Sequence, residues 1–74
     1  MNFHLTDIEV ACGVTLDKVT EIAAQAHTTS DRRVILPKDT GPALAGATAR
    51  YILRSRVDFV GLNILGYPVY EELT

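Results

Sequence analysis

The sequence has little of what disulfide and metal chemistry need. Cys12 is its only cysteine, so no disulfide can form within the chain. His4 and His27 are its only histidines, and neither stands at a metal-ligand spacing from Cys12. We therefore expect no metal site and no cofactor. The helical spacing around Cys12 predicts a small core residue rather than a nucleophile.

Catalytic and membrane patterns are also missing. Gly41 and Gly46 do not form a phosphate-binding glycine motif, and we expect that the protein is not an enzyme. No apolar run reaches the 18 residues or so of a membrane span, so no membrane partner is expected. The start of the chain, MNFHLTDIE, lacks the regions of a signal peptide. A free cysteine without an export signal predicts a cytoplasmic protein.

The length of 74 residues predicts a single domain over residues 1–74. A domain of this size buries only about 60% of its unfolded surface, so its stability is marginal. Small domains compensate with disulfides, metals, tight helix packing or oligomerisation. The first two are not expected here, and the apolar content of 47% is high. The composition therefore favours a homo-oligomer.

Charge is distributed unevenly along the chain. The net charge is −2, but residues 32–56 sum to +5 and hold six of the seven basic residues. Residues 1–31 sum to −4, and residues 57–74 sum to −3. A partner meets this local charge more than the total. The central block therefore predicts an acidic partner, either DNA or an acidic protein surface.

Capping signals and apolar periodicity predict an all-α fold, a small bundle of four to five short helices. Thr6 and Glu9 form a capping box that starts a helix over 6–12, and Thr15 caps a second over 15–27. The two segments also fit one continuous helix across Gly13. Further helices are expected from Asp39 or Thr40 to about 55, and from Asp58 to Gly66. One short extended segment is expected near 33–36, because Val34 and Ile35 are β-branched.

The most apolar stretch is 57–70, VDFVGLNILGYPVY, which is either core or an oligomer seam. The tail, 69–74, overlaps the end of this stretch and is expected to form a last turn or a docking strand. If this stretch is a seam, its large side chains form the oligomer interface. These are Phe59, Leu62, Ile64, Leu65 and Tyr67.

The basic block is the main functional lead of the sequence. Arg50 and Arg54 are four residues apart on one helix face, and Arg56 follows at the helix end. One interpretation is contact with nucleic-acid phosphates, which positions a protein without reading sequence. The other is that these side chains pair with the acidic flanks, within or between chains. The candidate nucleic-acid-binding residues are Arg32, Arg33, Lys38, Arg50, Arg54 and Arg56.

The first half of the chain resembles a helix-turn-helix with a wing. Two short helices meet around Gly13-Val14, and an extended piece follows. Glu9 stands where that motif usually has a small residue. Lys18 is the only basic residue of the second helix, which the resemblance casts as the recognition helix.

The segment R-R-V-I-L-P-K-D, residues 32–39, resembles the loop and last-helix start of the histone fold. In that family a basic pair and a β-branched pair precede an aspartate, seven positions after the first arginine. The resemblance implies a structural clamp between Arg32 and Asp39, with Arg33 facing DNA. A different register aligns 33–45 with the earlier loop of the same fold, leading into its central helix. In that register Asp58 and the LGY of Leu65–Tyr67 resemble the late part of CCAAT-box-binding histone-fold subunits. Small histone-like lids of AAA ATPases share the pattern without binding DNA.

Two functions remain open from the sequence. The first is a small DNA-associated protein, histone-like or a compact transcription regulator, that holds phosphates through the central basic block. The second is a protein-interaction module, such as an inhibitor, an accessory subunit or an antitoxin-like partner, without nucleic-acid binding.

Overall fold

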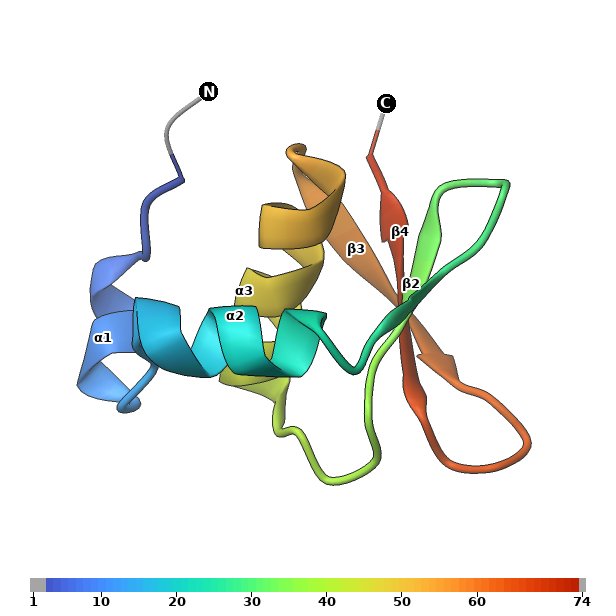
Figure 1. Cartoon of the computed structure of the whole chain (residues 1–74), viewed down its shortest axis with the longest axis horizontal. Coiled ribbons are helices and arrows are strands. Elements are labelled where there is room, and N and C mark those ends of the chain that lie inside the picture. Colours follow the sequence, from blue (N-terminus) through green and yellow to red (C-terminus); the bar gives the residue numbers. More distant parts are fainter. Residues whose placement is uncertain (1–2, 74) are drawn as a thin grey trace.

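The computed structural model describes residues 3–73 as three helices and a four-stranded antiparallel sheet (Figure 1). The chain is therefore mixed α/β, and the prediction of an all-α bundle is wrong. The elements in chain order are α1 (Asp7–Ala11), α2 (Leu16–Ala23), β1 (His27–Thr28), β2 (Arg33–Ile35), α3 (Pro42–Leu53), β3 (Val57–Leu62) and β4 (Pro68–Glu72).

The two N-terminal helices begin where their capping residues predict. The amide of Glu9 donates to Thr6 Oγ1 at 3.2 Å, and the amide of Thr6 donates back to Glu9 Oε1 at 2.9 Å. Thr15 Oγ1 accepts from the amide of Lys18 at 3.2 Å. Between the helices, Gly13 has a φ of +84°, which a side chain would strain. The prediction of two helices rather than one is confirmed.

Helix α3 begins without a side-chain cap. Its N-cap is Gly41, and Pro42 occupies the first turn, where its missing amide hydrogen costs nothing. The prediction that Asp39 or Thr40 caps this helix is wrong. Arg54 ends the helix in the left-handed conformation, with φ +56°.

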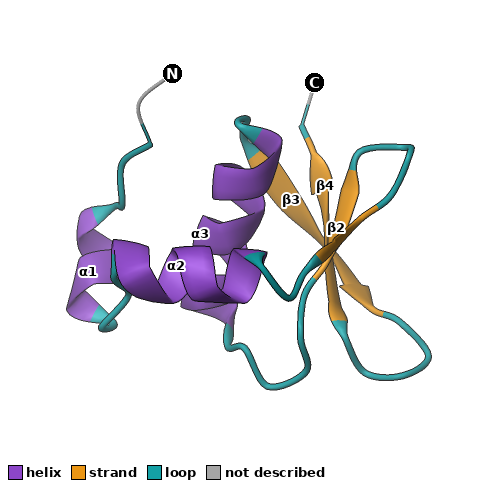
Figure 2. Ribbon diagram, viewed as in Figure 1, coloured by secondary structure: helices purple, strands orange, loops and turns teal. Residues whose placement is uncertain are grey.

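The sheet has the order β1-β2-β4-β3. The last strand, β4, lies between β2 and β3, with Tyr70 opposite Val34 on one side and opposite Phe59 on the other. The helices all lie on one side of the sheet (Figure 2). Among the described residues, no helix covers its other face.

The predicted helix from Asp58 to Gly66 is wrong, because 57–62 is strand β3. The physical reason is the partner: β4 pairs with β3 from Val57–Glu72 to Leu62–Pro68. A short apolar run suits a strand as well as a buried helix, and periodicity alone does not separate them. The extended segment near 33–36 is confirmed as β2, and the docking-strand alternative for the tail is confirmed as β4.

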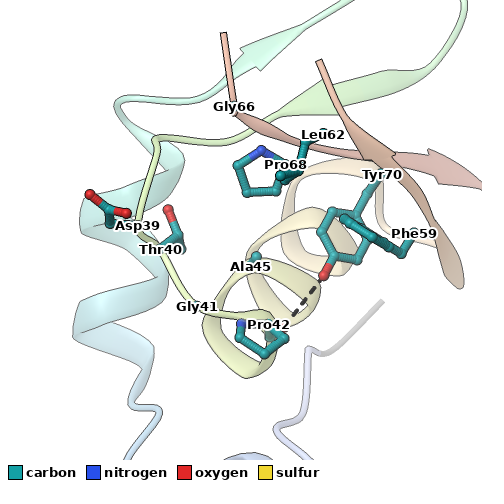
Figure 3. Close-up of a pocket in the computed structure, with 10 residues that line it drawn as sticks. All are labelled: Asp39, Thr40, Gly41, Pro42, Ala45, Phe59, Leu62, Gly66, Pro68 and Tyr70. Atoms are coloured by element: carbon teal, nitrogen blue, oxygen red, sulfur yellow. Dashed lines mark hydrogen bonds between the residues drawn. The ribbon is translucent and has the colours of Figure 1, made fainter. Parts of the chain in front are cut away.

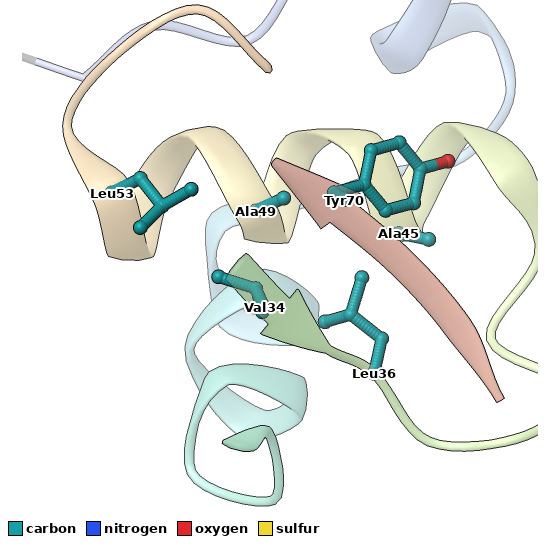
Figure 4. Packing of buried hydrophobic residues seen from close by; sticks show 6 residues of the cluster. All are labelled: Val34, Leu36, Ala45, Ala49, Leu53 and Tyr70. Atoms are coloured by element: carbon teal, nitrogen blue, oxygen red, sulfur yellow. The ribbon is translucent and has the colours of Figure 1, made fainter. Parts of the chain in front are cut away.

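Helix α3 lies between two apolar clusters, and its small residues allow close approach on both sides. One cluster faces the sheet (Figure 4) and contains Val34, Leu36, Ala45, Ala49, Leu53 and Tyr70. The other faces α1 and α2 and contains Val14, Val19 and Ala47.

The prediction that Cys12 is a core residue is wrong, and the apolar residues of α1 near it do not face inward either. Ile8 is 76% exposed, and Cys12 is exposed rather than part of the core. The residue of α1 that turns inward is Glu9, which reaches Arg50 on α3. Within residues 3–73, no helix has the length and apolar character that crossing a membrane requires.

Candidate functional site

The β3–β4 hairpin ends in a tightly bonded turn. The amide of Gly66 donates to the Asn63 carbonyl at 2.9 Å, and the Asn63 amide donates to the Tyr67 carbonyl at 2.9 Å. Asn63 Oδ1 accepts from the amides of Leu65 at 3.0 Å and Tyr67 at 2.9 Å. Gly66 adopts φ +84°, as the αL position of such a turn requires. Ile64 and Leu65 are therefore presented at a fixed tip.

Large apolar side chains gather on this hairpin and are exposed. Ile64 is fully exposed, Leu62 is 65% exposed and Leu65 is 64% exposed. From Phe59 to Tyr70 the chain contains no charged residue. Exposed apolar patches and a lack of charge are typical of interaction surfaces. We call this patch the hairpin surface; it consists of Phe59, Val60, Leu62, Ile64, Leu65 and Tyr67.

Strand β3 is one of the two edge strands of the sheet and pairs only with β4. Natural edge strands are usually protected by lysine, proline or strong irregularities. In β3 the only charged side chain is Asp58, and the register shifts once, between Phe59 and Gly61. The edge therefore carries modest protection beside exposed apolar side chains.

An apolar pocket of about 440 Å³ lies between the first turn of α3 and the hairpin (Figure 3). Tyr70 forms its floor, and the centre of the Tyr70 ring lies 5.3 Å from the centre of the Phe59 ring. The Tyr70 hydroxyl donates weakly to the Pro42 carbonyl at 3.5 Å, and burial raises the pKa of this phenol. The lining residues are Asp39, Thr40, Gly41, Pro42, Ala45, Phe59, Leu62, Gly66, Pro68 and Tyr70.

The first arginine pair of the basic block is held by carboxylates. Arg32 Nε lies 2.8 Å from Glu72 Oε2, and Arg32 Nη2 donates to the Leu53 carbonyl at 2.8 Å. The hydrogen bond with Glu72 raises the pKa of Arg32, and the same bond lowers the pKa of Glu72. Arg33 lies 3.5 Å from Glu71 and 3.7 Å from Asp31.

Arg50 is the most enclosed member of the block. Its Nη2 lies 2.6 Å from Glu9 Oε1, and the two side chains are only 23% and 13% exposed. Its guanidinium also lies 5.3 Å from the ring centre of Phe3. Arg50 therefore joins α3 to α1, and its charge faces the protein.

Of the remaining basic residues of the block, Arg54 and Arg56 lie at the C-terminal end of α3, and Lys38 lies in the loop before its N-terminus. Arg54, which ends α3, places its guanidinium 5.9 Å from the Tyr51 ring centre. Arg56 follows on the same side, where its carbonyl accepts from the Leu73 amide at 2.8 Å. Lys38 instead lies against Gly66, at the base of the hairpin turn.

The segments that resemble a helix-turn-helix and a histone fold can now be located in the structure. Helices α1 and α2 with the β1–β2 hairpin follow the element order of a winged helix-turn-helix. Glu9, which replaces the usual small residue, is accommodated by its ion pair with Arg50. In the histone-like segment, Arg32 pairs with Glu72 rather than with Asp39, which lies in the loop before α3.

The five residues predicted for an oligomer interface all lie on the β3–β4 hairpin and are exposed. Phe59 and Leu62 line the apolar pocket, whereas Leu65 and Tyr67 line a second recess beside Lys38. The apolar pocket was not foreseen, because its walls come from α3, β3 and β4. The sequence carried one signal for the turn beside the pocket: Asn63 stands three positions before Gly66, which is typical of a hairpin turn. None of the family models, curated proteins or solved structures compared with the chain matches it.

Proposed function

We propose that this chain is a protein-interaction module that binds through the hairpin surface. The observation that carries the proposal is the fixed, uncharged tip of Ile64 and Leu65 beside an open apolar pocket. Exposing such side chains to water is unfavourable by about 25 cal/mol per Å², and a partner that covers them recovers this free energy.

The basic block favours the same proposal. Binding to DNA depends on cations that are free to neutralise phosphates. Arg32, Arg33 and Arg50 already face carboxylates of the chain at 2.6–3.5 Å. The exposed charged residues of α2 are Asp17, Lys18 and Glu21, which together are acidic.

Affinity capture with matched variants tests the proposal. Tagged wild-type protein is expected to retain a protein partner in a fixed ratio. That partner is either another protein or an untagged copy of this chain. Ile64→Asp is expected to lose that partner, because a charge is placed at the centre of the surface. Ile8→Asp is the control, since Ile8 is 76% exposed on α1. Retention of the same partner by Ile64→Asp, or no partner for the wild type, rejects the proposal.

Duplex-DNA binding is a second candidate, favoured by the order α1, turn, α2 and β-hairpin. Fluorescence anisotropy with duplex DNA at low salt tests it. Affinity that falls steeply with added salt, and that weakens in an Arg54→Ala/Arg56→Ala double variant, favours this candidate. Binding that is absent at low salt eliminates it.

A further inference from the structure

We infer that the partner of the hairpin surface is a second copy of this chain, with each Ile64–Leu65 tip inserted into the pocket of the other copy. The inference rests on the proposed function, because it names the partner of that same surface. The result is a two-fold dimer in which the two hairpins cross.

The tip and the pocket belong to one continuous patch. Leu62 and Gly66 line the pocket and also flank the turn that carries Ile64 and Leu65. A projection and a recess side by side on one patch are self-complementary under a two-fold axis. Such an isologous contact closes after two copies and leaves no open end.

The volumes are compatible with insertion. Removal of one buried leucine side chain from a protein core leaves a cavity of about 150 Å³. The pocket holds about 440 Å³, so it has room for both aliphatic side chains of the tip. Its walls are mainly apolar, with the Tyr70 and Phe59 rings at the floor and Ala45 of α3 behind them.

The charges are compatible with a second copy, although each carries −2. The twelve residues from Phe59 to Tyr70 are uncharged, so the centre brings no like charges together. Lys38 lies against Gly66 at the base of the tip, and Asp39 lines the pocket. Each copy thus carries one basic and one acidic side chain at the rim of its pocket, so the rim has no net charge.

The area required is a modest share of the exposed surface of the chain. A standard interface covers about 800 Å² on each partner. The whole chain exposes 4877 Å², so an interface of that size takes about one sixth of it. Six exposed apolar side chains lie on β3 and the turn that follows it, and two of them, Phe59 and Leu62, line the pocket. A second exposed apolar group, Ile8, Val10 and Leu16, lies on α1 and α2. The recess of about 400 Å³ beside the turn between these helices has Lys18 and Thr40 in its lining and is more polar than the pocket beside the hairpin.

Sedimentation velocity of the purified chain over a range of concentrations tests the inference. The wild type and Ile8→Asp are expected to form dimers. Ile64→Asp places a charge on the tip and Leu62→Asp places a charge in the wall of the pocket, so each is expected to weaken dimerisation by about 100-fold, the size of a hot-spot loss. Circular dichroism confirms that each variant is folded. A wild type that stays monomeric, or an Ile8→Asp variant that weakens as much as Ile64→Asp, overturns the inference.

Mixing the two variants tests the reciprocal arrangement. Ile64→Asp retains its pocket and Leu62→Asp retains its tip, so the mixture is expected to form a heterodimer with one of the two insertions. Isotope-filtered NMR of the wild type provides a check without any variant. Intermolecular contacts between Ile64 methyl groups and the Tyr70 ring are expected, and a dimer without them overturns the inference.

The proposed function and this inference fail in different ways. A monomeric purified chain that still captures another protein through Ile64 retains the proposed function and eliminates the second copy as partner. A monomeric chain with no Ile64-dependent capture eliminates both.

Discussion

At the scale of single residues, Glu9 has two structural roles. Its Oε1 atom accepts from the Thr6 amide at 2.9 Å, which completes the cap of α1. The same atom accepts from Arg50 Nη2 at 2.6 Å, which holds α1 on α3. An ion pair with so little exposure leaves a costly unpaired charge when one partner is removed.

We expect Glu9→Ala and Arg50→Ala each to lower the free energy of unfolding by about 2 kcal/mol. The double variant is expected to lose less than the sum, with a coupling energy of at least about 1 kcal/mol. Urea denaturation measures all three variants. Glu21→Ala, an exposed residue of α2, is the control. Strictly additive losses would contradict a direct pair.

Glu72 gives the folded state a dependence on acid pH. Its hydrogen bond with Arg32 lowers its pKa below the usual value of 4.5. The stabilisation is therefore fully present above pH 4.5 and is lost as the pH falls through the lower folded-state pKa. We expect Glu72→Gln to flatten the decline of stability below pH 4.5, measured by urea denaturation at several pH values. Glu21→Gln should leave the decline as it is; an unchanged profile in Glu72→Gln contradicts this assignment.

At the scale of elements, different residues of the β3–β4 turn stabilise the fold and form the binding surface. Asn63 supports the turn through two hydrogen bonds to its side chain, while Ile64 extends fully into solvent. Neighbouring residues of one turn thus have different roles. This separation permits variants that alter the surface without altering the fold.

We expect Asn63→Ala to lower the free energy of unfolding by about 1–2 kcal/mol, because two backbone amides lose their acceptor. Ile64→Ser is expected to change the stability of the monomer by less than about 0.5 kcal/mol, as is usual for exposed positions. Denaturation at low protein concentration, where the chain is monomeric, measures both. Equal losses in the two variants would show that the tip is structural.

At the scale of the whole molecule, the small domain and its open surface belong together. The sheet is covered by helices on one face, and part of that face stays open as the pocket. A domain of 74 residues has limited stability of its own. Association that buries the hairpin surface would therefore add to the stability of the fold.

We expect the melting temperature of the wild type to rise with protein concentration, because a dimer that dissociates on unfolding is stabilised by mass action. Calorimetry over a hundredfold or so in concentration measures the shift. Ile64→Asp is expected to melt at one temperature throughout. A wild type without any concentration dependence would contradict coupled dimerisation.

How much of the structure could be predicted from the sequence depends on how far apart the interacting residues lie along the chain. Thr6, Glu9, Thr15 and Gly13 act within a few residues of themselves, so both N-terminal helices were predictable. The β-branched pair Val34-Ile35 likewise predicted β2. Phe59 to Tyr70 did not reveal whether it was helix or strand, because its partner strand was unassigned. The five interface candidates were named from their apolar character, and their exposure became known only from the fold.

The sequence by itself determined the capped helices, the uneven charge and the uncharged apolar stretch, because each is a property of neighbouring residues. Only the tertiary structure decided the pairing of β4 between β2 and β3, which made the chain mixed α/β. It also decided the arginine partners, since Arg32–Glu72 and Arg50–Glu9 join residues 40 and 41 positions apart. Contacts over such distances depend on how the whole chain packs, and no local pattern encodes them.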